Sequence, residues 1–237
     1  MTDPLFRSDA YAQSCQTSVL RHTETGGIVV AGSVFYPTGG GQPGDSGTLT
    51  WDGGSLTIED TRKDGSDIAL IPAEGSALPP TGSVVTMALD WERRHQFMRV
   101  HTALHLLSVA IPLPVSGGAI GTGKGRLDFD MPEAPEDKQA IEDALNALIA
   151  RDLPVTEDWI TDAALDANPG LVKTMSVRPP TGQGRVRLVR IGSGADQVDL
   201  QPCGGTHVKS TAEIGTVRLG KIEKKGKQNR RVTLWLD

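Results

Sequence analysis

The chain is poor in cysteine and has no long hydrophobic run. Cys15 and Cys203 are the only two cysteines among 237 residues, so a disulfide framework is not expected, and each thiol is available as a ligand. No apolar stretch is long enough to cross a bilayer. The N-terminal segment lacks a basic patch followed by an apolar stretch, so we expect no secretory signal, no membrane partner and a cytoplasmic location.

An excess of positive charge and a rich set of aromatic side chains are also missing. The formal net charge of −5 argues against a protein that coats nucleic acid non-specifically. Aromatic residues make up 4% of the chain, so stacking of bases on aromatic platforms is not expected. The net charge does not exclude local phosphate contacts, because these depend on where the basic residues lie.

Basic residues gather near the C-terminus and at the start of one predicted helix. The run KIEKKGKQNRR, residues 221–231, holds six basic residues against one acidic residue. Such a run is more often a solvated hairpin tip, and three arginines on the helix after Asp90 are what favour nucleic-acid binding here. The residues expected to contact a phosphate backbone are Arg93, Arg94, Arg99, Lys221, Lys224, Lys225, Lys227, Arg230 and Arg231.

The two halves of the chain differ in their patterns. Residues 14–90 form short strand-like segments separated by Gly, Pro and Asp clusters, which predicts a small barrel or a sandwich. Apolar spacings of three and four predict one helix between Asp90 and Pro112 and a second at about 135–150. Segments 184–192 and 230–237 alternate like half-buried strands, the second in a hairpin that turns near 226–229, whereas 153–184 gives no clear pattern.

Two pairs of histidine and cysteine residues suggest a metal site. His101 and His105 are four residues apart on the first predicted helix, so both imidazoles lie on one face, about 40° apart. Cys203 and His207 have the same spacing in a loop with two glycines. Either pair alone is more often structural, but together they hold three of the five histidines and one of the two cysteines. A Cys-His-His-His set suits one Zn²⁺ ion better than calcium or magnesium.

The spacing of the first pair argues against a metalloprotease. Ala103 and Leu104 lie between the two histidines, and the residue that follows His101 is Thr102 and not the glutamate of an HExxH motif, so no general base adjoins the ion in sequence.

A glycine-rich segment, FYPTGGGQPGDSG at residues 35–47, follows a predicted strand. Glycines allow backbone N–H groups to approach a ligand closely, although an ordinary turn is the simpler interpretation. The segment lacks the Lys-Ser/Thr pair of a phosphate-binding loop, so no ATP site is expected. The candidate substrate contacts in it are Thr38, Gly39, Gly40, Gly41 and Gln42.

In the order GGGQPGD, HTALH and CGGTH, these motifs resemble those of the AlaX family, free-standing relatives of the alanyl-tRNA synthetase editing domain. The resemblance covers nearly the whole chain and points to the longer subtype with an N-terminal barrel. It implies an α+β protein: a small β-barrel domain over 1–90, then an editing domain over 91–237 with an antiparallel sheet, shared with threonyl- and alanyl-tRNA synthetases. It also implies zinc bound by His101, His105, Cys203 and His207.

The implied activity is hydrolysis of mischarged tRNA(Ala), with seryl-tRNA(Ala) as the expected substrate and glycyl-tRNA(Ala) as a second one. In that reaction the backbone N–H groups of Gly204, Gly205 and Thr206 are candidate oxyanion donors. Thr38 is the candidate reader of the serine hydroxyl. Leu104 stands where the synthetase site has threonine, which leaves Thr102 as the nearby hydroxyl. Two alternatives stay open: a non-catalytic tRNA-binding module structured by zinc, and a metal-dependent hydrolase of small esters or amides. Sequence leaves the oligomeric state undetermined.

Overall fold

A computed structural model describes residues 1–135, 137–175 and 184–237 and confirms the α+β class. The chain divides into two compact units, Met1–His95 and Gln96–Asp237. The predicted boundary at residue 90 lies where helix α1 (Trp91–Ala110) begins, and this helix continues from the first unit into the second. No helix within the described ranges is both long enough and apolar enough to cross a membrane.

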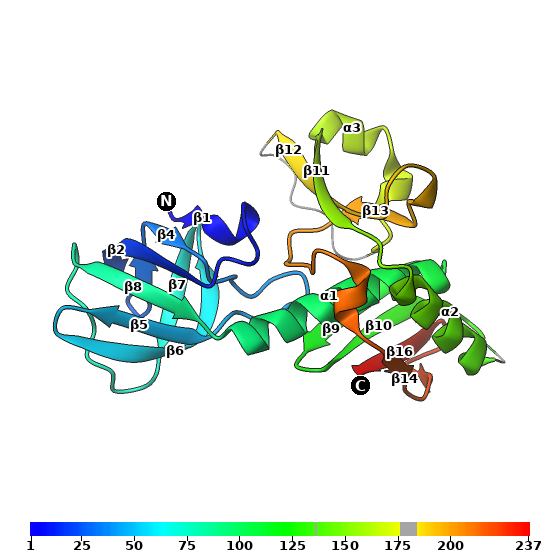
Figure 1. The fold of residues 1–237 in the computed structure, drawn as a ribbon, viewed down its shortest axis with the longest axis horizontal. Helices are drawn as coiled ribbons and strands as arrows, with labels where there is room; N and C mark the ends of the chain where they lie inside the picture. The colour runs from blue at the N-terminus through cyan, green and yellow to red at the C-terminus, as the bar shows by residue number, and fades with distance from the viewer. Residues whose placement is uncertain (136, 176–183) are drawn as a thin grey trace. The chain divides into compact units, whose positions relative to one another are not determined.

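The first unit is a barrel rather than a sandwich (Figure 1). Six antiparallel strands close on themselves, so each strand pairs with a neighbour on both sides. In barrel order they are β2 (Ser14–His22), β3 (Ile28–Val30), β7 (Asp67–Pro72), β6 (Gly54–Asp64), β5 (Gly47–Trp51) and β8 (Val84–Leu89). The short strands β1 (Asp3–Pro4) and β4 (Gly32–Ser33) pair in parallel beside it, and the turn η1 (Leu5–Arg7) follows β1.

Alternation along the strands fills the barrel interior. In β8, every second residue is buried, and Met87 is fully buried together with Leu49 of β5 and Ile58 of β6. Strand β7 was missed by the sequence analysis, because Ile68, Ala69 and Leu70 are buried in succession and do not alternate.

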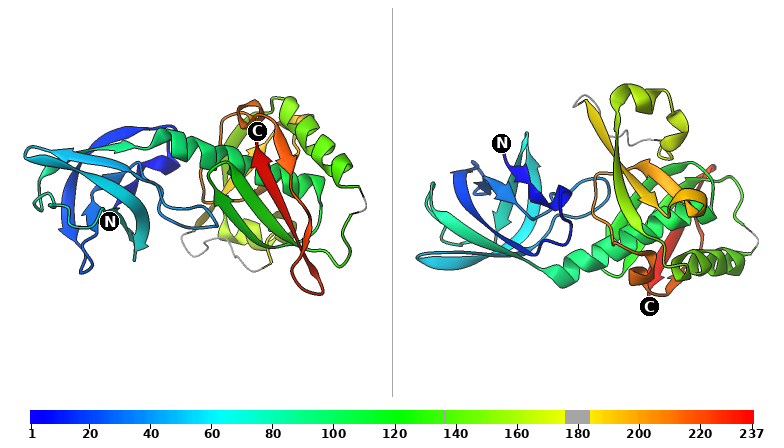
Figure 2. Two further views of the ribbon diagram at one scale, coloured as in Figure 1. Left: turned by 90° about the horizontal axis from the view of Figure 1, so that it is seen from below. Right: turned by 45° about the horizontal axis from the view of Figure 1, so that its top comes forward.

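The second unit is built on a five-stranded antiparallel sheet. Its strands are β14 (Val217–Leu219), β16 (Asn229–Leu236), β10 (Lys124–Asp130) and β9 (Val115–Gly121) in that order, with β15 (Glu223–Lys224) also pairing with β16. Helix α1 packs closely on β10: a Cβ added at Gly125 would lie 2.5 Å from Val100 and 3.1 Å from Leu104. Figure 2 shows α1 crossing this sheet. The glycine is therefore needed for the helix to approach the strand.

Helix α2 (Lys138–Ala150) protects the edge of that sheet. Its N-cap is Asp137, which accepts a hydrogen bond from Ala140, as a capping residue should. Asn146 of α2 exchanges two hydrogen bonds with the backbone of Val217 in β14, at 2.8 and 3.0 Å. The helix side chain thus satisfies backbone groups that an edge strand would leave exposed.

A separate three-stranded sheet holds the elements around the second histidine–cysteine pair. Its order is β11 (Val155–Thr161), β12 (Arg185–Ile191) and β13 (Asp199–Pro202). Short helices connect and flank the strands: α3 (Asp162–Asp166), η2 (Pro169–Leu171), η3 (Gly194–Asp196) and η4 (Thr211–Ile214). The predicted strand at 184–192 and the predicted hairpin at the C-terminus are both present, as β12 and as β15 with β16.

Candidate metal centre

Helix α1 and the loop after β13 bring four ligand residues together. His101 and His105 come from α1, and Cys203 and His207 come from the loop that lies against it (Figure 1). Their ligand atoms all lie within 4.8 Å of one another. The Cys203 Sγ atom is 3.4 Å from His101 Nε2 and 3.3 Å from His207 Nε2. The three imidazoles are less than one tenth exposed, so the cluster is buried.

These separations suit a tetrahedral zinc ion. With ordinary Zn–N and Zn–S bond lengths, a nitrogen and a sulfur on the same tetrahedral ion lie about 3.6 Å apart. The observed 3.3 and 3.4 Å are close to that value, and the three imidazole rings converge with centroid distances of 4.1, 4.6 and 5.3 Å. One thiolate and three imidazoles are ligands that zinc prefers. The residues present therefore fit the ion that the sequence predicts.

The second nitrogen of His207 is fixed by Thr102. The Thr102 hydroxyl donates to the carbonyl of Met98 at 3.0 Å, so it accepts from the Nδ1–H of His207 at 3.1 Å and from the Val208 amide at 3.3 Å. These bonds use the one proton and both lone pairs of the hydroxyl. The expected substrate contact of Thr102 is therefore corrected: the residue is buried and orients a metal ligand.

The second nitrogen of His105 is fixed by Asp199. The Asp199 carboxylate lies 3.0 Å from His105 Nδ1, accepts from Gln201 Nε2 at 2.7 Å and pairs with Lys173 Nζ at 2.6 Å. A carboxylate behind a metal-binding histidine sets its tautomer and ring orientation. Sequence reasoning missed these partners. The usable signal was the period-2 spacing of Asp199, Gln201 and Cys203, which places all three on one side of an extended segment.

The cluster favours a thiolate. Burial alone would raise the pKa of Cys203, but the neighbouring His101 and His207 hold that pKa well below its usual range. Burial alone would lower the pKa of His105, but hydrogen bonds with Asp199 and Cys203 raise it to about 9. The pKa of Asp199 falls to about 2 against the effect of burial, because His105 and Lys173 stabilise its charge. A thiolate is the form of cysteine that binds a metal.

The glycine-rich segment forms a tight turn in the first unit. Gly39 and Gln42 exchange two backbone hydrogen bonds of 3.0 Å, and between them Gly40 and Gly41 have φ angles of +58° and +84°. Two consecutive positive φ angles define a type I′ turn, which glycine adopts without strain. The run of glycines therefore has a local structural reason.

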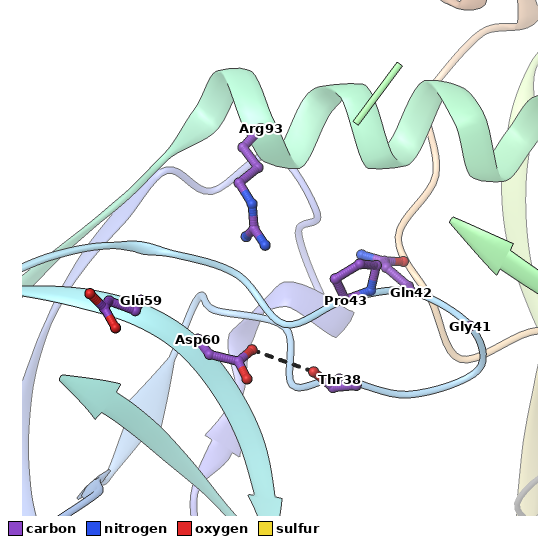
Figure 3. A pocket seen from close by; sticks show the side chains of 7 residues that line it. All are labelled: Thr38, Gly41, Gln42, Pro43, Glu59, Asp60 and Arg93. Carbon is purple, nitrogen blue, oxygen red and sulfur yellow. Dashed lines mark hydrogen bonds between the residues drawn. The ribbon is translucent and has the colours of Figure 1, made fainter. Parts of the chain in front are cut away.

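A surface pocket lies beside this turn (Figure 3). The Thr38 hydroxyl accepts from the Gly44 amide at 2.8 Å, and its own proton has only long contacts, 3.5 Å to Asp60 and 3.4 Å to the Thr61 carbonyl. Thr38 is exposed, so its hydroxyl retains hydrogen-bonding capacity. The pocket is lined by Thr38, Gly41, Gln42, Pro43, Glu59, Asp60 and Arg93.

Two of the expected phosphate contacts need correction. Arg94 is fully buried: it pairs with Asp45 and donates to the carbonyls of Val34 and Ala10. Arg230 is 9% exposed and donates to the carbonyls of Pro132, Gly226 and Asn229. Neither guanidinium is accessible to a phosphate, because each holds its own part of the fold together.

The other expected basic residues differ in whether their side chains already bind acceptors within the protein. Arg231 makes a two-pronged ion pair with Asp128, at 2.7 and 2.9 Å, and Arg99 donates twice to the carbonyl of Ile214. Arg93 donates to the Gly44 carbonyl at 2.8 Å. The exposed basic side chains of the tail are Lys221, Lys224, Lys225 and Lys227, of which Lys225 pairs with Glu223.

Two family models match this chain. Residues 186–233 match the threonyl and alanyl tRNA synthetase second additional domain, and residues 9–93 match the class II (A) tRNA synthetases. The first match contains Cys203 and His207 together with most of β12. Both units of the chain are thus similar to domains of tRNA synthetases, and the ligand cluster lies in the second unit.

Relatives of similar length identify the family. The chain is 31% identical to the alanyl-tRNA editing protein AlaX-M of Methanosarcina acetivorans and 33% identical to that of Methanosarcina barkeri, over 98% of each chain. It is also 34% identical to the alanine–tRNA ligase of Pyrobaculum arsenaticum over 94% of this chain, but spans only 25% of that ligase. The chain belongs to the AlaX-M family of alanyl-tRNA editing proteins.

Proposed function

We propose that this protein is a deacylase that removes the amino acid from mischarged tRNA(Ala), with seryl-tRNA(Ala) as the main substrate and glycyl-tRNA(Ala) as a second one. The observation that carries the proposal is the closed Cys-His-His-His cluster beside the CGGTH loop, in a chain whose full-length relatives are alanyl-tRNA editing proteins. The tRNA synthetase domain models that match both units of the chain support the same partner.

The reaction is hydrolysis of the ester between the amino acid and the terminal ribose. Water adds to the carbonyl carbon, the carbonyl oxygen becomes an oxyanion, and the bond to the ribose oxygen breaks as that oxygen takes a proton. The oxygen of the attacking water stays with the amino acid as part of its carboxyl group. The products are a free amino acid and a tRNA with a free ribose hydroxyl.

The chain supplies donors for the oxyanion in the loop between its last two ligand residues. A zinc ion held by His101, His105, Cys203 and His207 would supply a fixed positive charge that positions the amino acid or ribose end of the substrate. Four protein ligands make a closed site of the kind that is usually structural. We therefore assign stabilisation of the oxyanion to the backbone N–H groups of Gly204, Gly205 and Thr206.

The Gly204 amide supports that assignment. Within the described ranges, no protein group accepts a hydrogen bond from it, and a Cβ built at Gly204 would meet nothing within 4 Å. Gly204 is thus exposed next to the candidate metal ligand Cys203. An amide in such a place can donate to a ligand without first breaking a bond within the protein.

Discrimination between serine and alanine is assigned to Thr38 in the turn of the glycine-rich segment. A polar partner for the serine hydroxyl rejects substrates that lack this group. The Thr38 hydroxyl retains hydrogen-bonding capacity because its proton makes only long contacts in the protein. Backbone groups of Gly39, Gly40, Gly41 and Gln42 would contact the same substrate.

Phosphate contacts are assigned to the exposed lysines of the tail and to Arg93. Lys224, Lys225 and Lys227 are exposed on the hairpin of β15 and β16, and Lys221 is exposed just before it. Contacts of this kind position a tRNA and carry little sequence information. Arg99 and Arg231 remain secondary candidates, since each already has acceptors within the protein.

Side-by-side deacylation of seryl-, glycyl- and alanyl-tRNA(Ala) tests the function directly. We expect release of serine to be much faster than release of alanine, and Thr38→Val to narrow that difference while zinc content stays the same. Thr48→Val, on exposed barrel surface outside the pocket, is the matched control. If the protein binds tRNA but deacylates none of the three substrates, it is a tRNA-binding module and not a deacylase. Hydrolysis of small esters that uncharged tRNA does not inhibit would favour the general hydrolase.

A further inference from the structure

We propose that Arg187 is a positioning residue that aims the amides of the CGGTH loop at the carbonyl oxygen of the substrate. The inference deepens the proposed deacylase function and rests on it. Arg187 lies in β12, next to the strand that leads into the loop, and its side chain is 9% exposed. Nothing in the sequence distinguishes it from the neighbouring arginines of the segment RVRLVR.

The guanidinium of Arg187 holds two carbonyls of the loop at once. Its Nη1 atom donates to the carbonyl of Cys203 at 2.8 Å and to that of Gly205 at 2.9 Å. The backbone carbonyl of Arg187 also accepts from the Cys203 amide at 3.2 Å. On the other side, Nη2 pairs with Glu157 of β11 at 2.5 Å. The side chain is therefore fixed at both ends, and the loop is fixed to it.

Fixing these carbonyls also fixes the direction of the next amides. A trans peptide is planar, with its C=O and N–H groups pointing in opposite directions, and no described peptide bond is cis. The Cys203 carbonyl shares its peptide with the Gly204 N–H, and the Gly205 carbonyl shares its peptide with the Thr206 N–H. Because both carbonyls point at one guanidinium nitrogen, both N–H groups point away from it. Arg187 therefore fixes the orientation of two of the amides to which stabilisation of the oxyanion is assigned.

The charge of the guanidinium adds to this effect. A cation bound at a carbonyl oxygen polarises the whole peptide group, which makes the N–H on the opposite side a stronger donor. Gly204 is exposed and its amide has no acceptor among the described residues, so the amide is available to a substrate oxygen.

The burial of Arg187 carries a free-energy cost that a hydrogen bond between strand and loop does not by itself require. Its Nε atom is buried, and no group among the described residues accepts a hydrogen bond from it. A buried donor without a partner is destabilising, and such groups in native proteins call for an explanation. In this position the Nη1 atom serves both carbonyls while Nε has no acceptor among the described residues.

The test compares Arg187→Lys and Arg187→Met with Arg190→Met, which removes an arginine of the same strand that pairs with Asp158. For each protein we would measure zinc per chain, kcat and KM for seryl-tRNA(Ala), and the amide NMR signals of Gly204 and Thr206. We expect full zinc, KM within about twofold of wild type, and kcat lower by about 100-fold for Met, the lower end of the range found for loss of an oxyanion donor. The decrease for Lys should be smaller, about 10-fold, because lysine keeps a cationic donor near the carbonyls. The two amide signals should shift in both Arg187 variants and stay in place in the control.

The outcomes separate this inference from the proposed function. If wild type and Arg190→Met deacylate seryl-tRNA(Ala) and the Arg187 variants are equally active, the positioning role is wrong and the function stands. If kcat of the Arg187 variants falls only in proportion to the zinc that they lose, then Arg187 supports the metal ligand Cys203 and does not position the loop amides. That result also contradicts the inference. If wild type deacylates no mischarged tRNA, the proposed function itself fails. Should the Arg187 variants not fold, Glu157→Gln frees one end of the guanidinium and should lower kcat several-fold at full zinc; an unchanged kcat there contradicts the inference.

Discussion

Replacing Asp199 with asparagine should weaken zinc binding without changing any metal ligand. The Asp199 side chain is almost fully buried, and it meets donors on every side: His105 Nδ1 at 3.0 Å, Gln201 Nε2 at 2.7 Å and Lys173 Nζ at 2.6 Å. Asparagine keeps one acceptor oxygen and turns the other into a donor. Whichever way the amide is placed, its NH₂ group faces either the lysine or the histidine and glutamine.

The decrease expected from these contacts is about 10- to 100-fold in zinc affinity, which is the usual effect of removing an outer partner of a metal-binding histidine. That range corresponds to about 1.4–2.7 kcal/mol of binding free energy. The pKa of Asp199 is about 2, so the wild-type carboxylate is charged throughout an assay near neutral pH, and the difference should not depend on pH there.

Competition with a chromophoric zinc chelator measures this change directly. The matched control is Asp196→Asn, which removes the same charge from an exposed ion pair with Arg151 a short distance along the chain. We expect the control to bind zinc as wild type does. If Asp199→Asn binds zinc within twofold of wild type, then the carboxylate does not orient His105, and its contacts serve the fold alone.

Three further predictions concern the metal, the tail and the barrel. Elemental analysis should find about one zinc per chain, and Cys203→Ala should lose most of it while Cys15→Ala keeps it. Replacing the lysines within 224–227 by alanine should flatten the salt dependence of KM for tRNA by about 0.7–0.9 in log–log slope for each phosphate that is no longer neutralised; equal slopes would mean that the hairpin is only solvated. Asp45→Asn leaves a buried arginine unpaired and should lower the free energy of unfolding by about 3–5 kcal/mol in denaturant titration, whereas exposed Asp52→Asn should change it little.

The helix and strands that follow a regular pattern could be predicted from the sequence. Helix α1 was predicted from the spacing of its apolar residues, and Asp90 accepts a hydrogen bond from the Arg93 amide as the predicted N-cap. The strands that were missed break the expected pattern. Strand β9 is rich in glycine, and β11 buries none of its seven residues fully. Such strands are defined by their partners in the sheet and not by their own sequence.

The metal ligands could be predicted, and their hydrogen-bond partners could not. His101, His105, Cys203 and His207 belong to residue types that are scarce in this chain and rarely cluster by chance. Asp199 and Lys173 belong to common types, and 26 residues separate them. The burial of an arginine could not be predicted from the sequence either. Arg93 and Arg94 are adjacent in sequence and both contact the barrel unit, but only Arg94 is closed off from solvent.

The spacing of the CGGTH motif follows from what each position has to do. The side chains of Cys203 and His207, at its ends, belong to the ligand cluster. The backbone carbonyls of Cys203 and Gly205 accept hydrogen bonds from Arg187. Between these anchors, Gly204 has neither a positive φ angle nor a neighbour that a Cβ would touch, so neither backbone strain nor packing explains a glycine at that position. The proposed function supplies a reason: a side chain at residue 204 would stand in the open volume beside the ligand Cys203, where the proposed substrate carbonyl would have to approach the Gly204 amide.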